Sequence, residues 1–552
     1  MFHQKQAAAR PPKPDTTKWL WPEGPYLDYV TKLDTLYPGT GTTDPLNHHI
    51  SSRVGQSRSV LLELTPDQKW SRQTFKDGAE IKNHFTDRQQ NDVLGKTPVL
   101  SQRIYILEGL DPDFVQAYGS YFFMDPRFFV RQERNDLWNL NHNESVIHDT
   151  DILPSRIDPE RYFRIKYREV RHFGPQLRDW RTVCAATGRH VAAIGFQWNL
   201  DNNAAVARKF SFWSRMGRDD SWDVVILCDP PVHQVHILSR PMVTDIFQNE
   251  PFQGGYPDFI KREDANPKTP QSLDAPPRTS LLDDICFYYE NHYQSLINQP
   301  GSQAPLTPKV ATVVPLKIIC AHYLKLIDYF EVILTKLAKI EWQLSRQSDW
   351  EEYTGPAIEE QWSSLQLSSR RLSEFINDVE CILRDLRIPI QASPPDLGTS
   401  TTTSLCRSDW QQSCDEDFRY IYHRLQSMKS KVDQLITSTM GLSNIVGSRQ
   451  ALSEARRSVK EAKSTKTLTV VGLVFIPLAY TCALFSMSDQ FRPGAHLFWV
   501  YFAVSVPLVF VVFAGTFVIQ LGYDEDAAWS FEKFKRACLQ GLGKGKGKGR
   551  SG

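Results

Sequence analysis

The chain lacks the patterns of the common enzyme classes. It has no P-loop, no Gly-x-Ser-x-Gly nucleophile motif, no His-Glu-x-x-His zinc motif and no dinucleotide-binding fingerprint. The C-terminal run GLGKGKGKGR is rich in glycine, but it follows no strand and opens no helix, so we interpret it as a flexible basic tail. The sequence therefore predicts no catalytic residues and no enzymatic activity.

A cysteine framework and an excess of charge are also missing. The nine Cys are odd in number, widely spaced and without a Cys-x-x-Cys pair, which excludes a disulfide scaffold and a zinc finger and favours scattered reduced thiols. The 64 Lys and Arg balance 63 Asp and Glu, which argues against a nucleic-acid partner. With 30 Phe, 20 Tyr and 14 Trp among 552 residues, the chain can fill the cores of several folded units.

The first 15 residues contain no apolar run long enough for a secretory signal. Three basic residues precede the first acidic one, as in mitochondrial presequences. The prolines at positions 11, 12 and 14 break the amphipathic helix that such a presequence needs, so a mitochondrial location is the less favoured interpretation.

Two long uncharged runs stand near the C-terminus. Neither the segment TLTVVGLVFIPLAYTCALFSMS (467–488) nor residues 493–523 contain Asp, Glu, Lys or Arg. About 20 apolar residues suffice for a helix to cross a hydrocarbon core. Membrane helices tolerate prolines such as Pro477 and Pro507 better than soluble ones do. We therefore predict transmembrane helices over 467–488 and 496–521 rather than two buried core helices.

The short connection between these runs predicts a hairpin. Residues 489–495 include Pro493 and Gly494, so both ends of the hairpin lie on the same side of the bilayer. Basic residues flank the hairpin at 456, 457, 460, 463 and 466 and again at 533, 535, 536, 544, 546, 548 and 550. By the positive-inside rule both termini face the cytoplasm, or the matrix in a mitochondrion; the identity of the membrane stays open.

The fold class that we predict is an α+β cytosolic domain followed by long helices and a two-helix C-terminal transmembrane hairpin. Strand candidates lie at 103–107, 163–167, 191–196 and 222–228, and Asp-Pro pairs at 111–112 and 125–126 predict helix starts. The predicted soluble parts are an irregular N-terminal region (1–95), an α/β domain (96–250), a linker and connecting segment (251–312), a helical pair (313–388), a Pro/Ser/Thr linker (389–408) and a stalk helix (409–466). They are followed by the two transmembrane helices (467–488 and 496–521) and a basic cytosolic tail (522–552).

The stalk carries an apolar stripe in alternating steps of three and four residues. The stripe runs from Phe418 to Leu442 and resumes, shifted in register, from Ile445 to Ala462. Two interpretations remain open. The stripe is the core side of an ordinary bundle, or the helix continues unbroken into the first span as a coiled-coil stalk, a rod of about 80–90 Å.

A second stripe, mostly of small and hydroxyl residues, runs along the first predicted transmembrane helix in steps of four and three residues. Its members are Thr465, Thr469, Gly472, Ile476, Ala479, Ala483 and Ser486. In lipid, small residues mark helix contacts or the wall of a narrow lumen. Two helices of one chain do not enclose a water-filled path, so a pore requires several copies around an axis.

This arrangement resembles the CorA metal-ion transporter family: an α/β domain, long helices, a helix entering the membrane, two C-terminal spans and a very short loop. The end of the first span, Leu484-Phe485-Ser486-Met487-Ser488, matches the place of that family's Gly-Met-Asn signature. The stretch RIYILEGLDPDFVQAYGSYFFMDPRFF (103–129) resembles divergent CorA-like proteins of filamentous fungi. The resemblance covers about residues 96–523.

The resemblance implies a homopentamer with a cytosolic funnel and one central pore lined by the first span. In that family the signature Asn binds the hydrated divalent cation at the pore mouth, and metal sites between subunits gate the pore. This chain has Ser486 and Ser488 where the family has Gly and Asn, and it keeps Met487. A Ser hydroxyl still accepts a hydrogen bond from metal-bound water, and Asp489 adds negative charge beside it, so we expect Ser488 and Asp489 together to replace the Asn.

The function that we expect is passive transport of a divalent cation, Mg²⁺ by default, across the lipid bilayer by a homo-oligomer. The chain then needs no cofactor beyond the transported or regulatory ion. The alternative is a membrane-anchored sensor or scaffold that keeps this architecture without conducting, and the altered signature favours that alternative. An enzyme tethered by a hairpin is a third class, against which the lack of catalytic motifs argues. Asp111, Asp113 and Asp125 are candidates for regulatory metal ligands by residue type alone.

Overall fold

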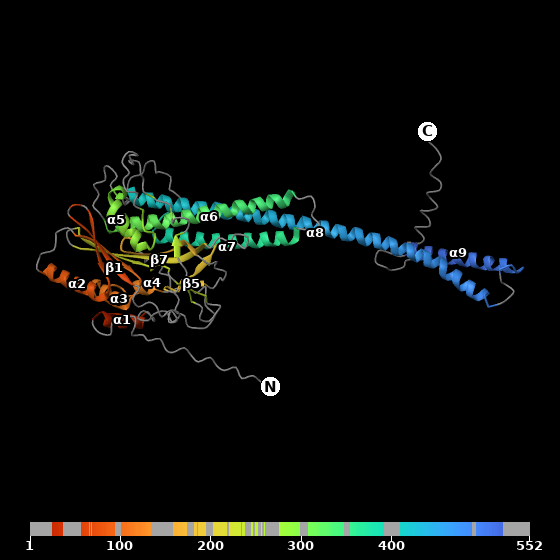
Figure 1. Ribbon diagram of the computed structural model, residues 1–552, viewed down its shortest axis with the longest axis horizontal. Coiled ribbons are helices and arrows are strands. Elements are labelled where there is room, and N and C mark those ends of the chain that lie inside the picture. The colour runs from red at the N-terminus through yellow and green to blue at the C-terminus, as the bar shows by residue number, and fades with distance from the viewer. Residues whose placement is uncertain are drawn as a thin grey trace, which may run out of the picture. The chain divides into compact units, whose positions relative to one another are not determined.

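The computed structural model divides the chain into two units, Met1–Met440 and Gly441–Gly552 (Figure 1). The residues that it describes are 25–36, 57–65, 67, 69–93, 101–133, 158–173, 182–184, 186–194, 203–217, 220–232, 234–237, 244–246, 249–251, 256, 259, 275–297, 307–346, 354–390, 409–487 and 493–522.

The first unit combines strands and helices, and the second is helical in its described part. In chain order the elements are α1 (Pro25–Leu36), β1 (Arg58–Leu64), β2 (Trp70–Phe75), α2 (Gly78–Val93), β3 (Gln102–Glu108), α3 (Pro112–Phe122), α4 (Arg127–Glu133), β4 (Tyr162–Phe173), β5 (Thr182–Cys184), β6 (Val191–Ala193), β7 (Asn203–Met216), β8 (Trp222–Cys228), β9 (Gln234–Ile237), β10 (Thr244–Ile246), β11 (Asn249–Pro251), α5 (Leu281–Ile297), the 3₁₀ helix η6 (Pro308–Thr312), α6 (Val313–Arg346), α7 (Thr354–Asp385), α8 (Asp409–Phe485) and α9 (Phe498–Gly522).

An eight-stranded mixed sheet organises the first unit. Its order is β11-β4-β7-β8-β3-β1-β2, with β6 paired to β7 beside this path, and a smaller sheet has the order β10-β9-β5. The pair β3–β8 is parallel, whereas β4–β7, β7–β8 and β1–β3 are antiparallel. Every residue of β3 and β8 is buried, because helices cover both faces of the sheet there.

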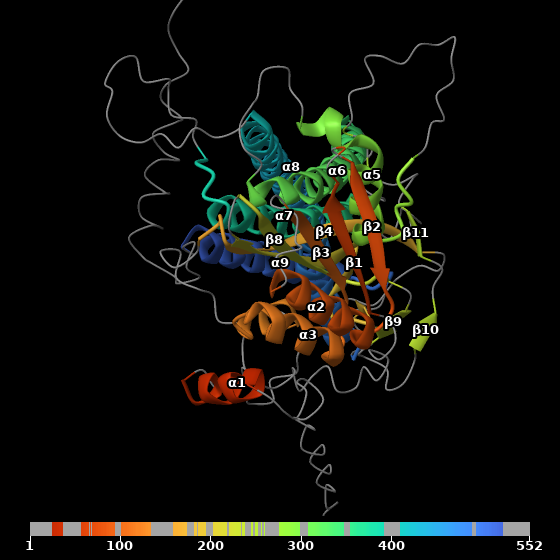
Figure 2. The ribbon, with the colours of Figure 1, turned by 90° about the vertical axis from the view of Figure 1, so that its left-hand side faces the viewer.

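Alternation along the strands divides the core into two layers. Ile104 and Ile106 of β3 face the layer that contains α5, α6, α7 and the first part of α8, whereas Tyr105 and Leu107 face the layer of α1 to α4. Figure 2 shows these two groups of helices on opposite sides of the sheet. The sequence prediction of an α+β domain followed by long helices is confirmed.

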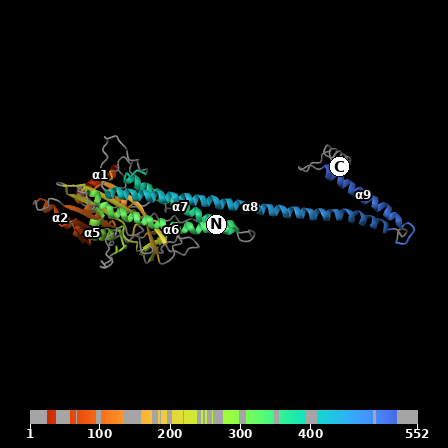
Figure 3. The same cartoon turned by 90° about the horizontal axis from the view of Figure 1, so that it is seen from above.

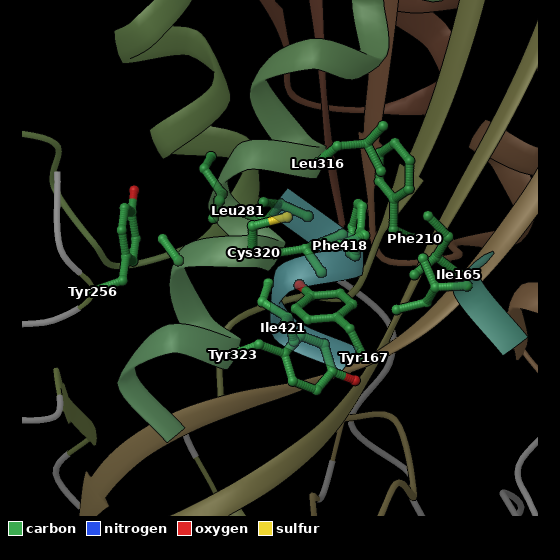
Figure 4. Packing of buried hydrophobic residues seen from close by; sticks show 14 of the residues in the cluster. Ile165, Tyr167, Phe210, Tyr256, Leu281, Leu316, Cys320, Tyr323, Phe418 and Ile421 are labelled. Carbon is green, nitrogen blue, oxygen red and sulfur yellow. The ribbon is translucent and has the colours of Figure 1, made fainter. Parts of the chain in front are cut away.

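The helices α6, α7 and the first part of α8 lie side by side against the sheet (Figures 1 and 3). Phe418 and Ile421 of α8 reach Tyr323 and Cys320 of α6 and the strand residues around Ile165 (Figure 4). These side chains are almost completely buried. The first half of the stalk stripe is therefore core, as the bundle interpretation predicts.

Two Asp-Pro pairs begin helices as predicted. The Asp111 carboxylate accepts a hydrogen bond from the backbone N–H of Asp113 at 3.0 Å, and Pro112 opens α3. Asp125 accepts from the N–H of Arg127 at 2.9 Å at the start of α4 and also pairs with the Arg127 guanidinium. These two carboxylates cap helices. Burial raises the pKa of Asp111.

The predictions of an irregular region over 1–95 and of a linker over 251–312 were wrong. The first contains α1, β1, β2 and α2, and the second contains α5 and η6. In β1, Val60, Leu61 and Leu62 are all buried, because the strand pairs on both edges and is covered on both faces, so it lacks the alternation that would reveal it. The domain prediction of 96–250 also separated β1 and β2 from the sheet to which they belong.

A buried ion cluster joins β4, β7 and α6. Glu169 accepts hydrogen bonds from Arg171 Nε at 2.7 Å and from Arg208 Nε at 2.6 Å, and the two guanidiniums hold its pKa well below the usual range despite burial. His322 Nε2 lies 4.0 Å from Glu169, but burial and the neighbouring guanidiniums outweigh that carboxylate and lower the pKa of His322 to about 4. His322 is therefore neutral at pH 7.

We expect His322→Phe to reduce the loss in the free energy of unfolding that the protein shows as the pH falls below 7. The unfolded histidine binds its proton near its ordinary pKa of 6.5 and the folded one only near 4, so stability is lost as the pH falls through this window. The expected loss is about 3 kcal/mol. Asp284, whose pKa burial raises to about 6, contributes in the opposite direction in both proteins. Denaturant unfolding at pH 7 and pH 4.5 measures the difference, and equal losses in variant and wild type would contradict the assignment.

The second unit contains the end of α8 and all of α9. The helix α8 has no break over its 77 residues, and the boundary between the units falls inside it, so the predicted continuous helix from stalk to first span is confirmed. Pro477 lies inside α8 and Pro507 inside α9. In this unit the apolar stripe residues Ile445, Leu452 and Val459 are exposed, unlike Phe418 and Ile421 of the first unit.

Candidate functional site

Among the described residues, three helices are long and apolar enough to cross a membrane: Pro308–Gln343, Gln411–Phe485 and Phe498–Thr516. The most apolar 18-residue window is 83% buried inside the protein in the first, but only 6% in each of the other two. The apolar surface of α6 is therefore the core of the first unit. The apolar surfaces of α8 and α9 are left open, which is unfavourable in water and suits a bilayer.

Hydroxyl groups in these apolar helices bond along their own helix. Thr469 Oγ1 donates to the carbonyl of Thr465 at 2.8 Å, and Thr516 Oγ1 to that of Val512 at 2.8 Å. Thr481 Oγ1 donates to Leu478 and Ser505 Oγ to Tyr501. Such bonds satisfy the hydroxyl donors without water, so they are compatible with a hydrocarbon environment.

Prolines leave two carbonyls of the apolar helices without a helical donor. Since Pro477 has no N–H, the carbonyl of Leu473 receives no bond from the residue four positions on, and Pro507 has the same effect on Ala503. Leu473 stands next to Gly472 of the small-residue stripe. The carbonyl oxygen of Leu473 thus provides a polar backbone atom at the level of Gly472 in α8.

The structure brings the predicted pore-lining residues onto one open face of α8. Thr465, Thr469, Gly472, Ile476, Ala479 and Ala483 all lie inside the helix, where steps of four and three keep side chains in register. Ile476 is 71% exposed, and a Cβ built on Gly472 would meet no atom within 4 Å. The stripe therefore has no cover from the described part of its own chain.

The signature region at the end of α8 is described only in part. The N–H of Ser486 donates to the carbonyl of Cys482 at 2.9 Å, and that of Met487 to Leu484 at 3.4 Å, so helical bonding continues to this point. The side chains of Ser486 and Met487 are exposed. Ser488 and Asp489 lie outside the described residues, so the expected replacement of the signature Asn by this pair stays a prediction.

Contacts between α8 and α9 lie on the other side of α8. The rings of Phe485 and Tyr501 meet edge to face with centroids 6.0 Å apart, and Phe498 and Phe502 complete an aromatic cluster around Tyr501. Thr481 of α8 is only 3% exposed. Successive residues of a helix are rotated by about 100° around its axis. Thr481 is therefore rotated by about 200° from both Ala479 and Ala483, and Phe485 by about 200° from Ala483, so Thr481 and Phe485 lie on the side of α8 opposite to the stripe.

Thr481, Ser505 and Phe485 were not singled out from the sequence. Small buried hydroxyl residues mark helix contacts in membranes, but the sequence offers several such residues in each span and does not say which of them face α9. The geometry separates two faces of α8: a face with Thr481 and Phe485, directed to α9, and an open face with the small-residue stripe.

No protein-family model matches the chain, and no curated protein matches it. The candidate site therefore rests on the geometry of the two apolar helices. Among the residues described, no three His, Cys, Asp or Glu side chains are grouped so that they would hold a metal ion. Asp111 and Asp125, two of the candidate regulatory ligands, serve as helix caps.

Proposed function

We propose that the chain is a passive divalent-cation transporter, with Mg²⁺ as the default ion, whose pore is formed by the C-terminal part of α8 in a homo-oligomer. The proposal places α8 and α9 across a bilayer as a hairpin, with both termini in the cytosol, and takes the oligomer to be a CorA-like homopentamer with a funnel of α+β domains. The resemblance of the sequence to that family motivates this arrangement.

The observation that carries the proposal is the open small-residue face of α8. Because α9 meets α8 on the face with Thr481 and Phe485, the stripe from Thr465 to Ala483 is free to meet other copies around an axis. Apart from Ile476, the stripe consists of hydroxyl residues, glycine and alanine, which keep such a lumen narrow and polar enough for hydrated ions. The exposed Ile445, Leu452 and Val459 on the same helix provide apolar contacts between copies.

Passive transport fits the chemistry of the chain. Moving a charge of +2 through 100 mV releases about 4.6 kcal/mol, so the membrane potential drives uptake without a nucleotide site. Mg²⁺ gives up its water reluctantly, and serine hydroxyls at the pore mouth are able to bind that water shell. Ser486, Ser488 and Asp489 are the residues that we assign to the mouth.

The altered signature favours a second candidate, a membrane-anchored sensor or scaffold that does not conduct. Ser488 is shorter than the family's Asn, so a ring of serines leaves a wider and less defined mouth. In this candidate the open stripe of α8 serves helix packing between copies alone. Oligomerisation is common to both candidates, so only an ion flux separates them.

Uptake of Mg²⁺ into liposomes tests the proposal. We expect the purified protein, with an ion-sensitive dye inside the liposomes and a negative interior potential, to give uptake that saturates with Mg²⁺. Hexamminecobalt(III), which has the size of hydrated Mg²⁺ and keeps its ligands, is expected to block it. Silence to Mg²⁺ and to other divalent cations, from protein shown to be an intact oligomer, would replace the transporter by the scaffold.

A further inference from the structure

A cationic cavity of about 410 Å³ lies between β4, β7 and α7 in the first unit. Eight Lys and Arg side chains and three carboxylates line it, and two of these arginines, Arg189 and Arg208, also pair with Asp229 and Glu169 outside the lining. Its volume lies within the range of small-molecule sites. Tyr167 is the one Phe, Tyr or Trp residue in the lining that the structure describes, so the cavity offers little stacking surface for a flat apolar ligand.

The strands place like charges directly opposite each other. Arg164, Lys166 and Arg168 alternate along β4 and so share one face of the strand. Lys166 is the cross-strand partner of Lys209 on β7, and the flanking partners, Ser211 and Ala207, are uncharged. Like charges directly opposite in a sheet are destabilising, so an anion held beside Lys166 and Lys209 would be favoured there.

Some compensation comes from neutral oxygens. Arg164 Nη1 and Lys209 Nζ both donate to the backbone carbonyl of Arg131, at 3.3 and 2.7 Å. A carbonyl dipole balances a cation less than a carboxylate does. On the α7 side, Arg168 Nε pairs with Asp378 at 2.7 Å. The carboxylates thus gather at α7, whereas the β4–β7 pair presents a surface rich in cations.

Arg371 of α7 adds an unsatisfied donor to the same cavity. Its Nη1 lies 3.2 Å from Glu374, but its Nε is buried without a hydrogen-bond partner among the described residues. Burial lowers the pKa of Arg371, and the nearby Arg168 lowers it further. The cationic form of Arg371 is therefore less stable here than in water, and an anion in the cavity would favour it.

We propose that this cavity binds a small anion carrying several phosphate groups. Guanidinium groups bind phosphate oxygens in a forked geometry, and several phosphates in a row match cations spread over two strands and a helix. The proposal is independent of ion transport, since every residue that it uses belongs to the first unit.

Binding of inorganic tripolyphosphate to the full-length protein in phosphatidylcholine nanodiscs tests the site by calorimetry. We expect saturable binding by the wild type and an affinity lower by about tenfold or more in Lys166→Glu. That substitution places an acid opposite Lys209, so the sheet gains a cross-strand ion pair while the cavity loses cationic charge. Lys82→Glu on the exposed surface of α2 makes the same change in net charge and is expected to bind as the wild type does.

The outcomes are distinct even if Lys166→Glu fails to fold. In that case Arg384→Gln, which changes a half-exposed side chain of the lining, is expected to weaken binding by itself. Competition from vesicles that contain phosphatidylinositol bisphosphate would identify a lipid headgroup as the natural source of the phosphates, and its absence a soluble one. No binding of tripolyphosphate or of these vesicles by the wild type, or equal affinity in all variants, would overturn the proposal.

Discussion

Replacing Glu169 by glutamine is expected to lower the free energy of unfolding of the first unit by about 3–5 kcal/mol. Glu169 accepts hydrogen bonds from Arg171 and Arg208, and all three side chains are almost completely buried. Glutamine keeps the shape and one acceptor oxygen but not the charge. Two guanidiniums then remain in the core with no carboxylate between them, and a buried cation without its partner is strongly destabilising.

Unfolding in denaturant, followed by the fluorescence of Trp70 and Trp222 in the core, measures this loss. The matched control is Glu461→Gln on α8, which removes a carboxylate from an ion pair with Arg457 whose two side chains are exposed. Such pairs contribute little to stability, so the control is expected to unfold at the wild-type midpoint. Equal midpoints for Glu169→Gln and the control would show that the buried cluster does not stabilise the unit.

Local signals account for the parts of the fold that the sequence predicted. Asp111 caps α3 and Pro112 opens its first turn, and residues 224–228 of β8 form a continuous apolar run that Pro230 and Pro231 follow. Among the elements that the sequence analysis missed, β1, β2 and α5 owe their structure to distant partners. Val60 is the cross-strand partner of Ile106 in the β1–β3 pair, and the sequence around either residue does not indicate this pairing.

The candidate site shows the same division between local and distant information. The small-residue stripe was predictable, because helical spacing alone sets which residues share a face of α8. Which face meets α9 was not, since it depends on the contact between Phe485 and Tyr501 across the loop. The cationic cavity was also missed, because Lys166, Lys209 and Arg371 are far apart in the chain and meet only through the β4–β7 pairing and the packing of α7.

Replacing Ala483 by tryptophan is expected to reduce Mg²⁺ uptake to the background of empty liposomes. Ala483 lies on the open small-residue face of α8, three residues before Ser486, which we assign to the pore mouth. If several copies place this face around an axis, each contributes a bulky indole at the same level, and the lumen closes. The measurement is dye-reported uptake under a negative interior potential, with the oligomeric state checked by mass measurement in detergent.

The matched control is Leu484→Trp, one residue further along α8. Leu484 is exposed but points about 100° away from Ala483, toward lipid in the proposed arrangement, where tryptophan near a membrane interface is well accommodated. It is therefore expected to transport as the wild type does. Loss of uptake in both variants would mean that the end of α8 tolerates no tryptophan at all. Full uptake in Ala483→Trp, from an intact oligomer, would place the ion path away from the stripe, because a narrow lumen does not admit a ring of indoles.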